Sequence, residues 1–225
     1  MSFFKASTDK KDLEQNSGGN YINKSGVYDV NLIVPFVSVS KGGSTVVDLF
    51  VDYNGQKQPV YGNMRITNNN GEPNKIGSKV FNQLVIIAGV EEVSEPVDAE
   101  LPIGKKGAAK DVPVLEDLSD IDVTVHVQME YSVNNGNIQE SKVIRGFYRT
   151  DDKASAEEIV NGANAGTQYE KNTKFFESDY YRDGLEEEQV KEWIKAGRPK
   201  GTANGGSSSS TSKTPSFSKK KTFGK

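Results

Sequence analysis

The sequence predicts a mainly β protein in which five strands and one helix share a core. Five segments alternate apolar and polar residues with a period of two, which places successive side chains on opposite faces of a strand. Between the third and the fourth of these segments, residues 74–92 carry apolar residues at helical spacing instead. The hydrophobic share of 34% is low for 225 residues, so we expect part of the chain to lie outside the core.

The first two strands are predicted at residues 26–39 and 45–53, joined by the glycine-containing turn SKGGST. Alternation places one face of the second strand in the core and leaves Phe50 on the opposite face, between Asp48 and Asp52. An aromatic ring on a wet face needs a contact. Two interpretations stay open: the ring packs under a terminal segment such as MSFF or KFFESDYY, or it stacks on a ligand.

The third strand is predicted in KQPVYGNMRITN, and the helix that follows it is expected to end at Gly89. Residues 94–120 are predicted to be a long irregular connection that carries the basic cluster GKKGAAKD. The clearest strand, DVTVHVQMEYSV, comes next, and residues 138–150 return as its partner after the turn NNGN. Pattern alone leaves open which face of this return strand points inward.

This order of three strands, a helix, a long loop and two strands is that of an OB-fold, a five-stranded Greek-key barrel with its helix between strands three and four. A generic small β-barrel or sandwich with one helix is the alternative. We assign residues 25–150 to this OB-like nucleic-acid-binding domain and residues 1–24 to a flexible N-terminal arm.

The chain changes character beyond residue 150. Residues 151–197 contain twelve acidic and six basic residues, and Ser155 with Glu158 forms the sequence pattern of a capping box, so we predict an acidic helical extension. Residues 198–225 are rich in glycine and serine and contain seven basic residues and no acidic one. Such a segment has too few apolar groups to fold, so we expect a disordered basic tail.

Several classes of function are disfavoured by composition. The chain has no cysteine and a single histidine, His126, which removes thiol nucleophiles, cysteine-ligated metals and clusters of imidazoles. The N-terminus lacks the apolar core of a signal peptide, and no apolar run is long enough to span a membrane. We therefore expect a non-enzymatic, soluble protein of a reducing cytoplasm, without cofactor, bound metal or membrane contact.

Binding of single-stranded nucleic acid fits the residue types better, because bases stack on aromatic side chains while basic side chains contact the phosphates. On an OB-fold, strands two and three and the adjoining loops usually hold the oligonucleotide. The carboxylates of Asp48 and Asp52 oppose this interpretation, since they repel phosphate. The candidate DNA-binding residues are Phe50, Tyr61, Arg65, Lys41, Lys105, Lys106, Lys110, Lys142, Arg145, Phe147 and Arg149.

The succession SGVYDVNLIV, STVVDLFVDYNG, KVFNQLVIIAGV, IDVTVHVQMEY and KVIRGFYRTDD resembles a family of bacteriophage single-stranded-DNA-binding proteins with an OB-type fold. The resemblance covers about residues 25–150. It implies a protein that coats single-stranded DNA without sequence preference during DNA replication, recombination or repair in the cytoplasm of an infected bacterial host. It also implies partnership with phage or host replication proteins through the C-terminal region.

The tail departs from the pattern of many single-strand-binding proteins, which end in an acidic tip with a final aromatic residue. Here the end is SFSKKKTFGK, which keeps the aromatics and reverses the charge. A basic tail adds phosphate contacts, docks on the acidic extension, or stays solvated. The alternative function is a protein-interaction or structural module that uses the barrel face as an interface, and a third is a strand-annealing recombination protein.

Overall fold

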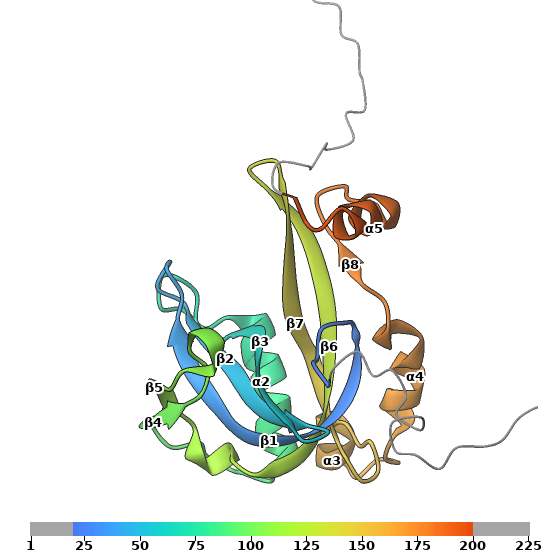
Figure 1. Cartoon of the computed structure of the whole chain (residues 1–225). Helices are drawn as coiled ribbons and strands as arrows, with labels where there is room; N and C mark the ends of the chain where they lie inside the picture. The colour runs from blue at the N-terminus through green and yellow to red at the C-terminus, as the bar shows by residue number, and fades with distance from the viewer. Residues whose placement is uncertain (1–19, 200–225) are drawn as a thin grey trace, which may run out of the picture.

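The computed structural model describes residues 20–199, which form a β-sheet with one helix on its core side and further helices from the C-terminal extension (Figure 1). Most of the N-terminal arm and nearly all of the basic tail lie outside the described residues. The strands are β1 (Gly26–Val39), β2 (Thr45–Tyr53), β3 (Gln56–Arg65), β4 (Val97–Leu101), β5 (Lys110–Val114), β6 (Ile121–Asn134), β7 (Asn137–Arg149) and β8 (Tyr180–Tyr181). The α-helices are α2 (Lys75–Ile87), α3 (Ala156–Asn161), α4 (Thr167–Phe176) and α5 (Glu187–Lys195), and the short 3-10 helices are η1 (Lys105–Gly107) and η2 (Glu116–Leu118).

Strand β1 is the centre of the sheet because two different partners share its length. Residues 26–32 pair with β6 and residues 31–39 pair with β2, while β3 pairs with β2 and β7 with β6. All these ladders are antiparallel, and only β8 pairs in parallel, with β6. The mainly β prediction is confirmed. The ladders of the described strands, however, form an open eight-stranded sheet rather than a closed ring of five.

Helix α2 forms where its apolar spacing predicts. Its N-cap Asn74 accepts a hydrogen bond from the backbone N–H of Gly77 at 3.0 Å, and Gly89 follows the helix with a positive φ of 70°. Val80 and Leu84 are buried in the main core with residues from β1, β2, β3, β6 and β7. Gly77 is required because a Cβ at this position would lie 1.9 Å from the carbonyl oxygen of Arg65 in β3.

The prediction of an irregular connection at residues 94–120 is wrong, because strands β4 and β5 form a hairpin there. The hairpin joins the sheet beside β1 through the pair Phe36–Val114. Its strands have five residues each, and the prolines Pro102 and Pro113 interrupt the pattern that would reveal them. The hairpin buries a second apolar cluster, consisting of Val34, Phe36, Phe50, Leu101, Val112 and Val114.

Strands β6 and β7 extend beyond the core as a long two-stranded ribbon, and the C-terminal extension runs along it (Figure 1). Helix α3 packs against α2, α4 lies against β6, and α5 lies near the tip of the ribbon. The predicted capping box of Ser155 and Glu158 is confirmed at α3. Docking of α5 on the ribbon forms a third apolar cluster, which consists of Met129, Tyr131, Ile138, Leu185, Val190 and Trp193.

Within residues 20–199, none of the helices has the length and apolar character that crossing a membrane requires.

Candidate nucleic-acid interface

Phe50 points away from the main core, as alternation predicts, but the expectation that it lies on a wet face is wrong. Its side chain is only 4% exposed because the β4–β5 hairpin covers it. Phe36 from β1 and Leu101 from β4 belong to the same cluster. The cover therefore comes from the β4–β5 hairpin, which lies between α2 and β6 in the sequence. Phe50 has no free ring face on which a base could stack.

Phe147 is also unavailable for stacking, because it is 1% exposed in the main core. The ladder between β6 and β7 shifts at this point: His126 pairs with Gly146, whereas Val127 pairs with Ile144. Arg145 is therefore the extra residue of a β-bulge. Both Ile144 and Phe147 are buried in the core, since the bulge switches the inward set of side chains from even to odd numbers. Simple alternation could not resolve the faces of this strand for that reason.

Asp48 does not stand beside the proposed surface as a wet carboxylate. The ladder between β2 and β3 is irregular here, since Val47 pairs with Met64 and Leu49 with Val60. The buried carboxylate of Asp48 accepts a hydrogen bond from the backbone N–H of Asn63 at 3.3 Å, within this irregularity. Burial raises the pKa of Asp48 to about 6, against the lowering effect of its hydrogen bonds.

The titration of Asp48 predicts a pH-dependent stability. A carboxyl whose pKa is raised on folding binds protons more tightly in the folded state, so its contribution to stability is complete below about pH 4 and is lost as the pH rises through 6. The variant Asp48→Asn has no carboxyl to ionise, so the wild type loses stability relative to it as the pH rises. We expect the difference in free energy of unfolding to grow in favour of the variant between pH 4 and pH 6, by about 1 kcal/mol per pH unit, and to level off above pH 6. Urea unfolding of both proteins across this range measures it, and a constant difference would contradict the burial of a charged group.

Tyr61 is the predicted platform residue that remains available, with 51% of its side chain exposed on β3. Its ring meets Phe36 edge-on at 6.0 Å between centroids, and its hydroxyl donates a hydrogen bond to the carbonyl oxygen of Ile103 at 3.3 Å. Ile103 leads directly into η1, where the exposed Lys105 and Lys106 lie. The structure thus brings together one exposed aromatic ring and a basic loop, which we name the hairpin face.

The other predicted basic residues are scattered. Lys41 is exposed in the β1–β2 turn, Lys110 begins β5, and Arg65 is half-buried at the end of β3. Lys142 lies on the ribbon, where burial lowers its pKa. Arg149 is engaged by both oxygens of Asp152, at 2.9 and 2.6 Å. Lys110 lies in the same hairpin as Lys105 and Lys106, whereas Lys142 and Arg149 lie on β7.

A second exposed aromatic residue, which sequence reasoning missed, lies on the ribbon. Tyr180 of β8 is 45% exposed, and the guanidinium carbons of Arg145 and Arg182 each lie 5.6 Å from the centre of its ring. Both arginines pair with Glu130, at 3.2 and 3.1 Å. Two positive charges share one negative charge, so the cluster carries a net charge of about +1. We call Tyr180, Arg145, Arg182 and Glu130 the ribbon platform.

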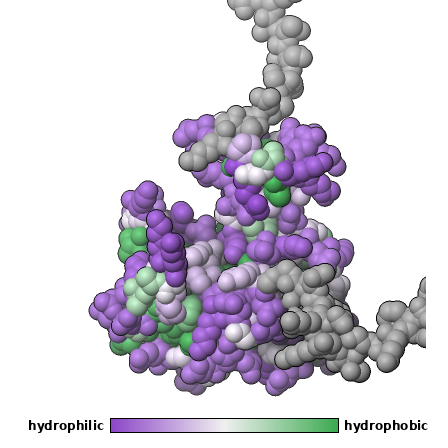
Figure 2. Space-filling view, viewed as in Figure 1, coloured by the Kyte–Doolittle hydropathy of each residue, from purple (hydrophilic) through white to green (hydrophobic). Residues whose placement is uncertain are grey.

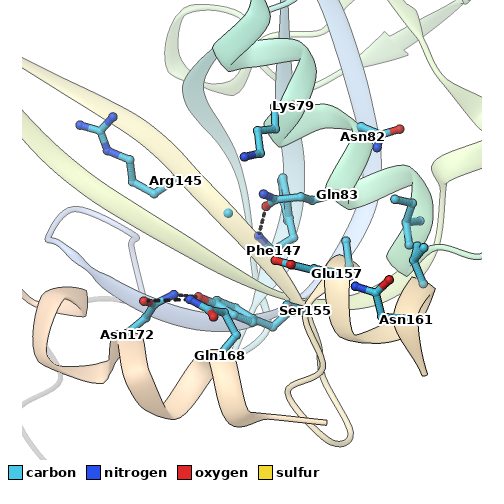
Figure 3. A pocket seen from close by; sticks show the side chains of 15 residues that line it. Lys79, Asn82, Gln83, Arg145, Phe147, Ser155, Glu157, Asn161, Gln168 and Asn172 are labelled. Carbon is cyan, nitrogen blue, oxygen red and sulfur yellow. Dashed lines mark hydrogen bonds between the residues drawn. The ribbon is translucent and has the colours of Figure 1, made fainter. Parts of the chain in front are cut away.

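Figure 2 shows that the molecular surface is hollowed between the β1–β2 turn and the ribbon, and that it is largely hydrophilic there. A separate cavity of 540 Å³ opens where α2, β7, α3 and α4 meet (Figure 3). Arg145 lines this cavity as well as the ribbon platform. Its other polar side chains are mainly amides, with Lys79 from α2 and Glu157 from α3.

The single histidine of the chain, His126, is buried on β6. His126 is covered by Phe176, with 5.0 Å between ring centroids, and burial together with the charge of Arg145 lowers its pKa to about 4. Residues 20–199 contain no group of three or more histidine, aspartate or glutamate side chains placed to hold a metal ion.

No protein-family model matches the chain, and no curated protein matches it.

Proposed function

We propose that this protein binds single-stranded DNA without catalysing a reaction, and that it coats the strand with little sequence preference during DNA replication, recombination or repair. In this proposal β1, β2, β3, β6 and β7 correspond to the five strands of an OB-fold, with α2 between the third and the fourth and the β4–β5 hairpin as an insertion. The close approach of β3 and β7 supports it. A Cβ at Gly62 would lie 2.2 Å from Ile144, so these strands touch where an OB barrel closes.

The observation that carries the proposal is the ribbon platform. The exposed ring of Tyr180 and the planar guanidinium groups of Arg145 and Arg182, each 5.6 Å from its centre, offer a base flat groups on which to stack and offer the adjoining phosphates a positive charge. The hairpin face repeats this combination with Tyr61, Lys105 and Lys106. Stacking of this kind tolerates every base because each has an aromatic face.

The family resemblance of the sequence extends the proposal to the biological setting. We place the protein in a phage-infected bacterial cytoplasm, with replication proteins as partners of its C-terminal region. A protein-interaction module is the competing function. Burial of Phe50 and Phe147 removes from the barrel face two aromatic residues that either function would use.

The proposal predicts that Tyr180→Ala weakens binding of the full chain to a fluorescein-labelled oligo-dT by about 5- to 100-fold, since one stacked base contributes roughly 1 to 3 kcal/mol. Fluorescence anisotropy at two salt concentrations measures it, and binding of the wild type falls as salt rises. Tyr21→Ala is the matched control, because Tyr21 is also an exposed tyrosine but belongs to neither surface.

A variant in which Lys219, Lys220 and Lys221 are each replaced by serine separates the binding contributed by residues 20–199 from that contributed by the C-terminal lysines. Retained affinity for oligo-dT, with weaker binding to the matching duplex, supports the proposal. If that variant loses all binding, or the wild type does not distinguish single strand from duplex, the basic tail alone attracts nucleic acid and the proposal fails.

A further inference from the structure

The cavity between α2, β7, α3 and α4 has the size and chemistry of a site for one small polar aromatic ligand (Figure 3). Its 540 Å³ lies within the range of small-molecule sites, and Ile86 and Val160 provide apolar surface at its side. The polar groups come from three separate helices, which is typical of sites that orient a ligand. They include the side chains of Asn82, Gln83, Glu157, Asn161, Gln168 and Asn172.

Basic groups lie beside the cavity. Lys79 reaches in from α2, and it forms none of the ion pairs found among residues 20–199 (Figure 3). Arg145 lines the cavity with its stem and carries its guanidinium group to Tyr180. A strand that stacks on Tyr180 would therefore pass the cavity with its phosphates near two cationic side chains.

The polar walls are already ordered. The side-chain oxygen of Gln83 accepts a hydrogen bond from the backbone N–H of Phe147 at 3.4 Å. Across the cavity Gln168 donates to Asn172, which donates to the hydroxyl of Tyr148 at 3.0 Å. Because these amides are held by the fold, a ligand loses little free energy to their ordering.

Glu157 decides the chemical class of the ligand. Its carboxylate points from α3 toward Gln83 and the backbone of Phe147 (Figure 3), and carboxylate oxygens accept hydrogen bonds. Guanine is the base with two adjacent donors on its Watson–Crick edge, the N1–H and the N2 amino group, next to the O6 acceptor. A carboxylate matches the two donors, and the amide nitrogen of Gln83 matches O6.

We propose that this cavity holds one guanine base turned out of a bound single strand, with Glu157 accepting from its Watson–Crick edge and Lys79 contacting the adjoining phosphate. The inference rests on the proposed function, since the strand itself is held by stacking at the ribbon platform. The protein then binds DNA of any sequence, and guanines determine its preferred positions along the strand.

The test compares the full chain on three labelled 20-nucleotide probes by fluorescence anisotropy: oligo-dT, the same strand with one central dG, and the same strand with deoxyinosine at that place. The dG probe is expected to bind about tenfold more tightly than oligo-dT, because a good bidentate contact discriminates between bases by roughly that factor or more. Deoxyinosine lacks the N2 amino group and should lose most of the gain.

Glu157→Ala should abolish the preference for dG without weakening binding to oligo-dT. Glu170→Ala on α4 is the matched control, because Glu170 is an exposed acid that does not line the cavity. Equal affinity of the wild type for oligo-dT and the dG probe, or a dG preference that survives Glu157→Ala, overturns the guanine site while the proposed function stands. Absence of binding to all three probes overturns both.

Discussion

Replacement of Gly77 by alanine is expected to destabilise the protein by more than about 2 kcal/mol, although alanine is the better helix former. In an exposed helix the same change stabilises by about 1 kcal/mol. Here the added methyl group would lie 1.9 Å from the carbonyl oxygen of Arg65, which belongs to the backbone of β3 and cannot turn aside. Helix α2 would have to move away from the sheet whose core it helps to close.

Urea unfolding followed by circular dichroism measures this loss. Lys75→Ala, at the exposed first position of the same helix, is the control and should change stability by less than about 0.5 kcal/mol. If Gly77→Ala proves as stable as the wild type, the close packing of α2 on β3 is not present in solution.

Phe50→Ala is expected to cost about 3 to 5 kcal/mol of stability, the usual range for deleting a buried aromatic ring. The ring fills the cluster between β1, β2 and the β4–β5 hairpin, and the short hairpin has few other apolar residues with which to collapse into the space. The same unfolding experiment applies. Because the lysines of η1 belong to this hairpin, the variant should also weaken the hairpin face.

The control is Val39→Ala, since Val39 is an apolar residue of β1 that is 71% exposed and should tolerate the change. A Phe50→Ala variant with wild-type stability and strongly reduced affinity for oligo-dT would mean that Phe50 is a stacking residue in solution. The cover by the hairpin would then be open in the DNA-binding form.

The parts of the fold that sequence predicted are those whose signals are local. The α2 helix, its terminal Gly89 and the capping box of Ser155 and Glu158 each depend on residues within one or two turns. The main strands carry enough alternating residues to be visible as well. The β4–β5 hairpin was missed because each strand has five residues and its apolar positions, such as Val112 and Val114, are separated by charged residues and proline.

The candidate interface was harder to predict because it depends on contacts between distant segments. Alternation placed Phe50 opposite the main core, but no local signal says that a hairpin some 50 residues later covers it. A single extra residue at Arg145 changed which side chains of β7 point inward. Tyr180 meets Arg145 only because β8 pairs with β6, and two residues are too few to read as a strand.

The position of Trp193 has a spectroscopic consequence. It is the single tryptophan of the chain, and it is 7% exposed near the tip of the ribbon. The ring centroids of Trp193 and Tyr131 lie 6.5 Å apart, and the indole N–H donates a hydrogen bond to the carbonyl oxygen of Pro199. The main core contains no tryptophan, so tryptophan fluorescence reports first on the docking of α5 against β6. Release of α5 and loss of the sheet are therefore separately visible, the first by emission and the second by circular dichroism.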